Sequence, residues 1–470
     1  VMDMYELTMS NGYLNQGFKD TWVAFDVFYR NNPDNGGFAI FAGLQQVVEY
    51  IENLHFSEED VEYLRSKRLF TEEFLEYLLH FRFRGDIYAM KEGTVMYPNE
   101  PVMTVVAPLI DAQLIETTIL LEINHQSLIA TKTNRIVQAA NGKPVSDFGA
   151  RRAHNVDAAV YGARAAYIGG AAGTATVLAG KMFHIPISGT MAHSWVMTFD
   201  SEYDAFKAYA ESYPDGTVLL VDTYDVLKSG VPNAIRTARE VLEPMGKKLI
   251  GIRLDSGDLA YLSKEARKML DEAGLPDCMI VASNSLDEYT ISSLNRQGAK
   301  IDSYGVGERL ITSSSTPVFG AVYKLVAIQK DGKFIPKIKI SETAEKITNP
   351  GIKEVYRVYD ENGKAVADYL AVKGEQIRDF EPVRYVDPVN YWKNRSFVGC
   401  RFKKLQVPVF EKGKRIYDLP DIEEIRQYVK DQLENEIWEE EQRFENAHTH
   451  YLDMSPAMFE LKMSLLHEEN

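Results

Sequence analysis

Two short apolar runs decide the fold class: Thr217-Val218-Leu219-Leu220-Val221 and Lys248-Leu249-Ile250-Gly251-Ile252-Arg253-Leu254. An aspartate directly follows each run, Asp222 after the first and Asp255 after the second. Runs of this kind, separated by segments of helical spacing, are typical of strands in βα units around a parallel sheet. In such folds, ligands bind at the carboxyl ends of the strands. Both aspartates are therefore expected to line one binding mouth.

The same alternation extends over residues 143–330. Four further runs fit it: 144–146, 184–187, 279–282 and 301–304. Each is followed by polar or glycine residues, which are expected at the same mouth: Asp147, Ser188-Gly189-Thr190, Ser283-Asn284 and Gly305-Val306-Gly307.

The flanking regions show other patterns. Before residue 143, strand-like alternation at 22–29 is followed by helical spacing at 71–81. Three short runs then predict a small antiparallel sheet, at 86–90, 94–97 and 102–107, and a long helical segment follows at 111–140. After residue 330, the chain predicts polar hairpins and a charged helical tail at 421–445. The acidic run 436–441 within this tail is most simply a solvated helix face.

The composition is that of an ordinary globular protein. A chain of 470 residues, 45% hydrophobic and 26% charged, has room for two or three domains. Fifty-two Lys and Arg against 68 Asp and Glu give a net charge of −16, which argues against a nucleic-acid partner but not against small anions. The two cysteines form no zinc or disulfide motif, and no apolar run approaches the ~20 residues of a membrane span. These features predict a cytoplasmic protein without a membrane partner.

Three segments near the predicted mouth carry candidate chemistry. Arg151 and Arg152 follow the first strand, where guanidinium groups can hold a carboxylate or phosphate, although surface salt bridges would also explain them. His193 lies in a turn after the next run and is either a general base or nucleophile, or structural. Asp222 and Asp255 suit Mg²⁺, which bridges to substrate phosphates.

Other residues near the mouth give weaker signals. The glycine-rich segments 169–174 and 305–307 would let backbone N–H groups approach a phosphate. Neither has the G-x-G-x-x-G spacing of a dinucleotide-binding fold. Asp225 and Asp258, a few residues beyond their strands, are equally explained as helix N-caps.

Five motifs, taken together and in this order, resemble those of the nicotinate phosphoribosyltransferase family: Tyr5-Glu6-Leu7-Thr8-Met9, Asp147-Phe148-Gly149-Ala150-Arg151-Arg152, Gly189-Thr190-Met191-Ala192-His193-Ser194, Val221-Asp222-Thr223-Tyr224-Asp225 and Arg253-Leu254-Asp255-Ser256-Gly257-Asp258. The resemblance implies an α/β fold in three parts. These are an N-terminal α/β domain (1–135), an irregular TIM-like α/β barrel with the active site (136–330), and a C-terminal segment that packs back on the N-terminal domain (331–470).

The resemblance also implies an activity. A homodimer with active sites at its interface would form nicotinate mononucleotide and pyrophosphate from nicotinate and phosphoribosyl pyrophosphate. Mg²⁺ would assist, and ATP as a co-substrate would be hydrolysed through a phosphohistidine.

Roles for individual residues follow from the same matching. His193 matches the phosphorylated histidine, and Tyr5 would stack on the pyridine ring from the partner subunit. Thr190 and Arg253 would contact nicotinate, and Arg151 would serve the anionic substrates. The other implied positions are Asp222 and Asp255 in catalysis and Mg²⁺ binding, and Phe148, Gly305, Gly307 and Glu308 in substrate binding.

Glu308 departs from the family pattern, which has a threonine after Gly-x-Gly. A carboxylate about 4 Å from a phosphate would cost on the order of 4 kcal/mol at an effective dielectric near 20. We therefore expect Glu308 to turn away, or to be compensated by Mg²⁺ or by adjacent Arg309. Glu308 is also the only support for an alternative, a catalytically silent homologue that binds pyridine or phosphoribosyl ligands.

Two further alternatives concern the base. Nicotinamide phosphoribosyltransferase resembles this chain at 147–149 and 173–177, but it has an aspartate where this sequence has Ala175. Without that acceptor the amide N–H has no partner, which favours nicotinate. A quinolinate-using enzyme would need a second carboxylate clamp that the sequence does not reveal, and that family is much shorter.

Overall fold

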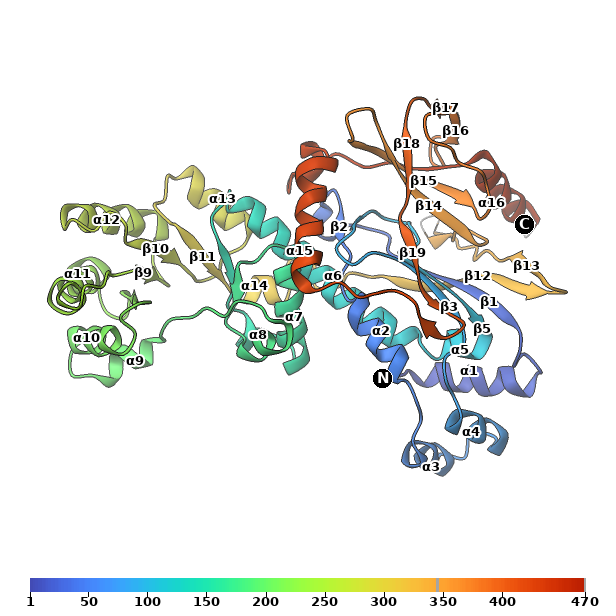
Figure 1. Ribbon diagram of the computed structural model, residues 1–470, viewed down its shortest axis with the longest axis horizontal. Coiled ribbons are helices and arrows are strands. Elements are labelled where there is room, and N and C mark those ends of the chain that lie inside the picture. The colour runs from blue at the N-terminus through green and yellow to red at the C-terminus, as the bar shows by residue number, and fades with distance from the viewer. Residues whose placement is uncertain (344–345, 469–470) are drawn as a thin grey trace. The chain divides into compact units, whose positions relative to one another are not determined.

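The computed structural model describes residues 1–343 and 346–468, which form two compact units (Figure 1). Val1–Leu128 and Val318–Asn470 belong to the first unit, and Ile129–Pro317 form the second. The second unit is thus one continuous segment inserted between two parts of the first. No helix in the described part of the chain is both long and apolar enough to cross a bilayer.

Six parallel strands form the sheet of the second unit, which confirms the predicted α/β class. Their spatial order is β7 (Gly173–Thr174), β6 (Val145–Asp147), β11 (Ser303–Val306), β10 (Met279–Ala282), β9 (Gly251–Leu254) and β8 (Val218–Leu220). The core residues Ile252, Leu254 and Ile280 are fully buried in adjacent strands. The apolar runs of the sequence therefore lie where buried strands were expected.

Aspartates cap two helical segments of the second unit, α12 (Leu259–Glu272) and the turn Val226–Gly230. Asp258 accepts a hydrogen bond from the Tyr261 N–H at the start of α12, and Asp225 accepts one from the Lys228 N–H. Both aspartates therefore have the N-cap role that the sequence allowed. The helices are α7 (Val156–Ile168), α8 (Val177–Phe183), α9 (His193–Thr198), α10 (Glu202–Ser212), α11 (Val231–Thr237), α12 (Leu259–Glu272), α13 (Glu288–Arg296) and α14 (Glu308–Ile311).

The predicted strand at 184–187 is reduced to one bridge, between Ile187 and Thr174. His184 has a φ of +58°, a left-handed conformation that interrupts extended backbone. β7 and β8 are therefore the two edge strands of this sheet. Closure of this sheet into a barrel remains a prediction.

The first unit contains two larger sheets. One is antiparallel, in the order β13 (Lys333–Pro336), β12 (Val322–Lys330), β1 (Trp22–Phe28), β5 (Met103–Pro108), β3 (Asp86–Met90), β19 (Gln406–Glu411) and β20 (Lys414–Arg415). The other has the order β17 (Asn394–Phe397), β16 (Val383–Val386), β21 (Leu452–Met454), β15 (Ala365–Val372), β14 (Lys353–Tyr359) and β18 (Arg401–Lys404). The predicted strand at 94–97 joins neither, because β4 (Val95–Met96) pairs with β2 (Ala39–Ile40).

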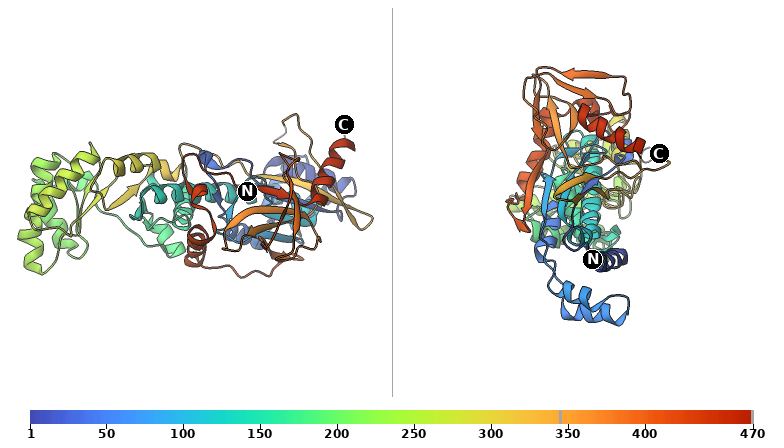
Figure 2. Two further views of the ribbon diagram at one scale, coloured as in Figure 1. Left: turned by 90° about the horizontal axis from the view of Figure 1, so that it is seen from above. Right: turned by 90° about the vertical axis from the view of Figure 1, so that its right-hand side faces the viewer.

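Helices surround these sheets. They are α1 (Met4–Asn15), α2 (Leu44–Asn53), α3 (Glu58–Ser66), α4 (Glu72–Leu79), α5 (Leu109–Gln113), α15 (Ile422–Asp431) and α16 (Pro456–Glu468), while α6 (Glu116–Ala139) begins in the first unit and ends in the second. Within the first unit, α3 and α4 project from the body of the sheets (Figures 1 and 2).

A buried charge network lies between segments of the first unit. Arg357 donates two hydrogen bonds to Asp368, of 2.9 and 2.8 Å, and His450 lies between Asp368 and Glu441 at 3.3 and 2.9 Å. Burial alone would raise the pKa of Asp368, but Arg357 holds it well below its usual range. Glu441 is buried and also accepts from the Tyr97 hydroxyl at 2.6 Å, so the prediction that 436–441 is a solvated helix face is wrong at this residue.

Candidate active site

His193 and two strand-end aspartates form a cluster at the mouth of the parallel sheet. The His193 Nε2 atom lies 3.6 Å from Asp255 Oδ2 and 3.9 Å from Asp222 Oδ1. Each of the three residues offers one ligand atom, and these atoms lie within 4.8 Å of one another. Asp222 follows β8, Asp255 follows β9, and His193 is the first residue of α9. The structure thus brings together His193, Asp222 and Asp255, which the sequence predicted to lie at one mouth of the sheet.

Hydroxyl groups fix this cluster. Asp222 Oδ2 accepts from the Ser256 hydroxyl and from the Asp255 N–H, the latter at 3.2 Å. Asp255 Oδ1 accepts from the Ser283 hydroxyl. The other oxygen of Asp222 is buried and has no hydrogen-bond partner among the described residues. Because a buried carboxylate oxygen without a partner is costly, this atom is the one most suited to an added cation.

The His193 ring is oriented from its other side. Its Nδ1 atom lies 3.1 Å from the Thr223 hydroxyl. The Thr223 hydroxyl can donate to Nδ1 or accept from it, according to the tautomer, while Nε2 faces the carboxylates of Asp222 and Asp255.

Two arginines supply positive charge. Arg253, on β9, donates to the Thr190 hydroxyl, and its Nε–H is buried without a partner in the described part of the chain. Burial lowers the pKa of Arg253, and the neighbouring charge of Arg151 lowers it further. Arg151 is exposed and forms no hydrogen bond or ion pair with any other described residue. The pair Thr190 and Arg253 can therefore bind an anionic group, and Arg151 is free to do so.

The Asp147-Phe148 segment packs against the glycines after β11. The buried Asp147 carboxylate accepts from the Gly149 N–H at 2.9 Å and from the Thr174 hydroxyl at 2.8 Å, and burial raises its pKa. A Cβ atom on Gly305 would lie 2.3 Å from the Phe148 ring, and one on Gly307 would lie 3.3 Å from the Phe148 carbonyl oxygen. These glycines therefore allow close packing of Phe148, whatever else they bind.

Glu308 opens α14 and is mostly exposed, with its carboxylate 3.9 Å from Arg152 Nε. The expectation that Arg309 compensates it is wrong, because Arg309 pairs with Asp287 at 2.7 Å. Arg152 and Glu308 line a cavity of about 430 Å³ together with His154, Thr312, Ser314 and Pro317. Glu308 thus faces a cation and a cavity rather than a structural partner.

Two other predicted features lie elsewhere. Tyr5 is on α1 in the first unit, where its side chain is 42% exposed. In the glycine-rich segment 169–174, a Cβ on Gly169 would lie 2.3 Å from the Ala130 carbonyl oxygen, and one on Gly173 would lie 2.5 Å from that of Pro186. This segment is therefore required for backbone packing, which the sequence did not distinguish from phosphate binding.

Sequence reasoning gave no orienting role to the hydroxyl groups of Thr223, Ser256 and Ser283, although it placed Ser283 at the mouth. Two of them directly follow a strand-end aspartate, in Asp222-Thr223 and Asp255-Ser256. That adjacency was the available signal, since a hydroxyl one residue beyond a strand-end acid can reach other groups at the same mouth, as Ser256 reaches Asp222 and Thr223 reaches His193.

Comparisons with known proteins find one family over nearly the whole chain. Three family models match: the nicotinate phosphoribosyltransferase (NAPRTase) N-terminal domain at residues 1–124, the NAPRTase family at 144–362, and the C-terminal domain at 352–462. The chain is 47% identical to nicotinate phosphoribosyltransferase of Bacillus subtilis, over 99% of this chain and 94% of that protein. It is 41% identical to nicotinate phosphoribosyltransferase pncB2 of Mycobacterium tuberculosis, over 92% and 86%.

Solved structures are also similar. The crystal structure of human nicotinic acid phosphoribosyltransferase matches with a TM-score of 0.89 and 27% identity, over 99% of this chain and 100% of that one. Nicotinate-nucleotide pyrophosphorylase from Pyrococcus furiosus matches with a TM-score of 0.69 and 26% identity, over 93% and 95%.

Proposed function

Since the chain belongs to the nicotinate phosphoribosyltransferase family, we propose that it forms nicotinate mononucleotide and pyrophosphate from nicotinate and phosphoribosyl pyrophosphate, a step of NAD salvage. The observation that carries the proposal is the cluster of His193, Asp222 and Asp255 beside the Arg253–Thr190 pair. Displacing pyrophosphate from C1 of the ribose requires charge stabilisation and positioning rather than a covalent intermediate on the protein. Strand-end acids and nearby arginines supply both.

In this proposal the arginines bind the anionic groups of the substrates. Arg253 and Thr190 hold the nicotinate carboxylate, and Arg151 holds a phosphate. Phe148, packed on Gly305, forms an apolar wall beside them. Ala175 offers no carboxylate, so a nicotinamide N–H would find no acceptor there and a nicotinate carboxylate would meet no repulsion.

The proposed cofactor is Mg²⁺, held by Asp222 and Asp255. The donor set fits, because both residues offer carboxylate oxygens, and no residue that the structure describes forms a hydrogen bond with the buried Asp222 Oδ1. When bound, the ion would neutralise charge on the pyrophosphate leaving group. Ser256 and Ser283 keep the two carboxylates in place with or without the ion.

We propose that ATP hydrolysis is coupled to transfer through His193. The Nδ1 lone pair attacks the γ-phosphorus of ATP; the P–N bond forms as the bond to the bridging oxygen breaks, and ADP leaves. Asp222 and Asp255 hold the Nε2 proton and stabilise the positive charge that develops on the ring. Water later cleaves the P–N bond and releases phosphate.

The proposed assembly is a homodimer in the cytoplasm. Exposed apolar side chains gather on and beside α8, where Val177 is 67% exposed and Ile187 is 58% exposed. Val177 is the first residue of α8, and Ile187 packs on the same helix, since a Cβ on Gly180 would lie 2.3 Å from the Ile187 side chain. A partner subunit would bury this surface and could supply Tyr5 to the site. Both cysteines are free thiols, in keeping with a reducing compartment.

The test is product formation. Phosphoribosyl pyrophosphate and Mg²⁺ are incubated with nicotinate, nicotinamide or quinolinate, with and without ATP, and products are identified by mass spectrometry. Nicotinate mononucleotide, formed faster with ATP, is the expected result. Preference for another base would overturn the substrate assignment, and no product from any base would favour a catalytically silent homologue.

A second experiment tests the role of His193. His193→Ala should lose ATP hydrolysis but keep slow transfer without ATP. His184→Asn is the matched control, because His184 is exposed in the same unit and asparagine tolerates its positive φ. Unchanged coupling in His193→Ala would refute the phosphohistidine assignment.

A further inference from the structure

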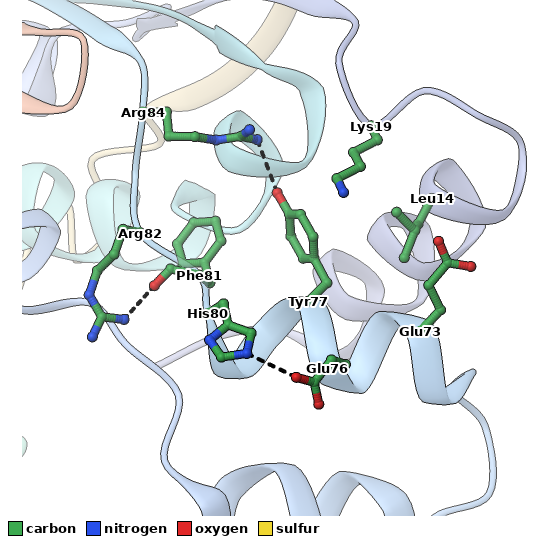
Figure 3. A pocket seen from close by; sticks show the side chains of 9 residues that line it. All are labelled: Leu14, Lys19, Glu73, Glu76, Tyr77, His80, Phe81, Arg82 and Arg84. Atoms are coloured by element: carbon green, nitrogen blue, oxygen red, sulfur yellow. Dashed lines mark hydrogen bonds and ion pairs between the residues drawn. The ribbon is translucent and has the colours of Figure 1, made fainter.

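A second cavity lies entirely within the first unit, where the projecting α4 meets the end of α1 (Figure 3). Its volume of about 480 Å³ is within the range of small-molecule sites, roughly 300–1,000 Å³. It shares no residue with the site at the parallel sheet. Its lining combines an apolar wall, three basic side chains and a short acidic edge: Leu14, Lys19, Glu73, Glu76, Tyr77, His80, Phe81, Arg82 and Arg84.

One wall of this cavity is rigid. Arg84 Nη2 donates to the buried Asp111 carboxylate at 2.7 Å and to the Tyr77 hydroxyl at 3.1 Å. The Tyr77 hydroxyl also donates to Asp111 at 3.2 Å. Burial and the Asp111 charge raise the pKa of Tyr77, so the phenol stays neutral. The Tyr77 ring is therefore held in place as a flat, uncharged surface, which a bound ring could stack against without ordering cost.

Two cations at this wall have no acidic partner among the described residues. Lys19 Nζ lies 5.7 Å from the centre of the Tyr77 ring, and Arg82 donates to the Phe81 carbonyl oxygen at 2.5 Å. Neither forms an ion pair in the described part of the chain. Arg84, by contrast, is already neutralised by Asp111. Lys19 and Arg82 are thus the charges still able to bind an anion.

The acidic edge does not cancel these charges. Glu76 contacts His80 at 2.9 Å, and Glu73 lies on the side of Lys19, away from Arg82 (Figure 3), but forms no ion pair with Lys19 among the described residues. A ligand of matching chemistry has a planar apolar ring for Tyr77 and Phe81 and a negative group for Lys19 or Arg82, which lie on opposite sides of these two rings (Figure 3). We propose that this cavity is a second small-molecule site, which takes an aromatic anion.

The test uses 8-anilinonaphthalene-1-sulfonate, an aromatic anion whose fluorescence rises on binding, titrated into the full-length protein. A double variant, Lys19→Gln with Arg82→Gln, should weaken binding about tenfold or more, because both unpaired charges are removed. Both residues are exposed, so the fold should be kept. N-phenyl-1-naphthylamine, which lacks the sulfonate, should bind the wild type and the double variant equally.

Lys67→Gln is the matched control. Lys67 is an exposed lysine of the same unit whose Nζ lies 4.3 Å from the centre of the Tyr63 ring, and it does not line the cavity. Its loss should leave the dissociation constant unchanged. The proposal is overturned if the double variant binds the sulfonate as the wild type does, or if Lys67→Gln weakens binding as much.

Discussion

A methyl group at position 305 should disrupt the packing beneath the proposed site. The Cβ of Gly305→Ala would lie 2.3 Å from two Phe148 ring atoms, whereas carbon atoms in contact lie about 3.5–4.0 Å apart. The Phe148 backbone is held by its hydrogen bond to Val306, at 2.8 Å, so the ring or β11 must shift by more than about 1 Å. Overpacking of this kind costs about 1–3 kcal/mol. We expect a loss of about 2 kcal/mol in the free energy of unfolding, measured by urea denaturation, and a lower kcat/KM.

Two further variants isolate the cause. Gly189→Ala lies at the same mouth with no atom within 4 Å of its Cβ, and should leave stability within about 0.5 kcal/mol of the wild type. Phe148→Leu in the Gly305→Ala background should recover part of the lost stability, because the smaller side chain vacates the ring position. A Gly305→Ala variant as stable as Gly189→Ala would refute the packing argument.

Three other predictions concern the side chains of Arg357, Asp453 and Glu308. Arg357→Met leaves Asp368 buried without its cation and should cost about 3–5 kcal/mol in urea denaturation; a loss below about 1 kcal/mol would contradict the ion pair's burial. Burial and the charge of Asp387 raise the pKa of Asp453 from 3.8 to about 7. The folded state therefore keeps a proton that the unfolded state releases, and stability should fall as pH rises through that window. Thermal melts against pH should show a shallower slope in Asp453→Asn than in the wild type, and equal slopes would contradict the raised pKa of Asp453. Glu308→Thr should lower the KM for phosphoribosyl pyrophosphate by about tenfold, and an unchanged KM would place Glu308 outside the site.

Much of the second unit could be predicted from sequence, because its strands at 218–220, 251–254 and 279–282 are short, mostly apolar and largely buried. The run 279–282 coincides with β10, and the runs ending at Val221 and Leu254 contain β8 and β9. The run 184–187 failed for a local reason. Its composition suits a strand, but His184 adopts a left-handed conformation that periodicity cannot reveal.

Which residues meet at the site was predictable where topology decides, and not where side-chain geometry decides. Asp222 and Asp255 follow neighbouring parallel strands, so their proximity follows from the fold. The partner of Arg309 could not be predicted from the order of the strands, because it depends on the path of α13 and on its N-cap residue, Asp287. Burial of Glu441 was equally hidden, because it rests on Tyr97 and His450 from distant parts of the chain.

The insertion of one unit within the other has a consequence for synthesis on the ribosome. Ile129–Pro317 emerge as a continuous segment and can fold while the rest of the chain is still being made. The first unit cannot be completed until its last segments have been synthesised. The Val95 N–H donates to the Gln432 side chain at 2.9 Å and the Tyr97 hydroxyl donates to Glu441, so both groups lack their acceptors until then. Until then these polar groups and the strand edges of residues 1–128 are exposed. Premature termination near residue 430 would therefore leave an incomplete first unit for proteolysis, even though every residue of the parallel sheet had been translated.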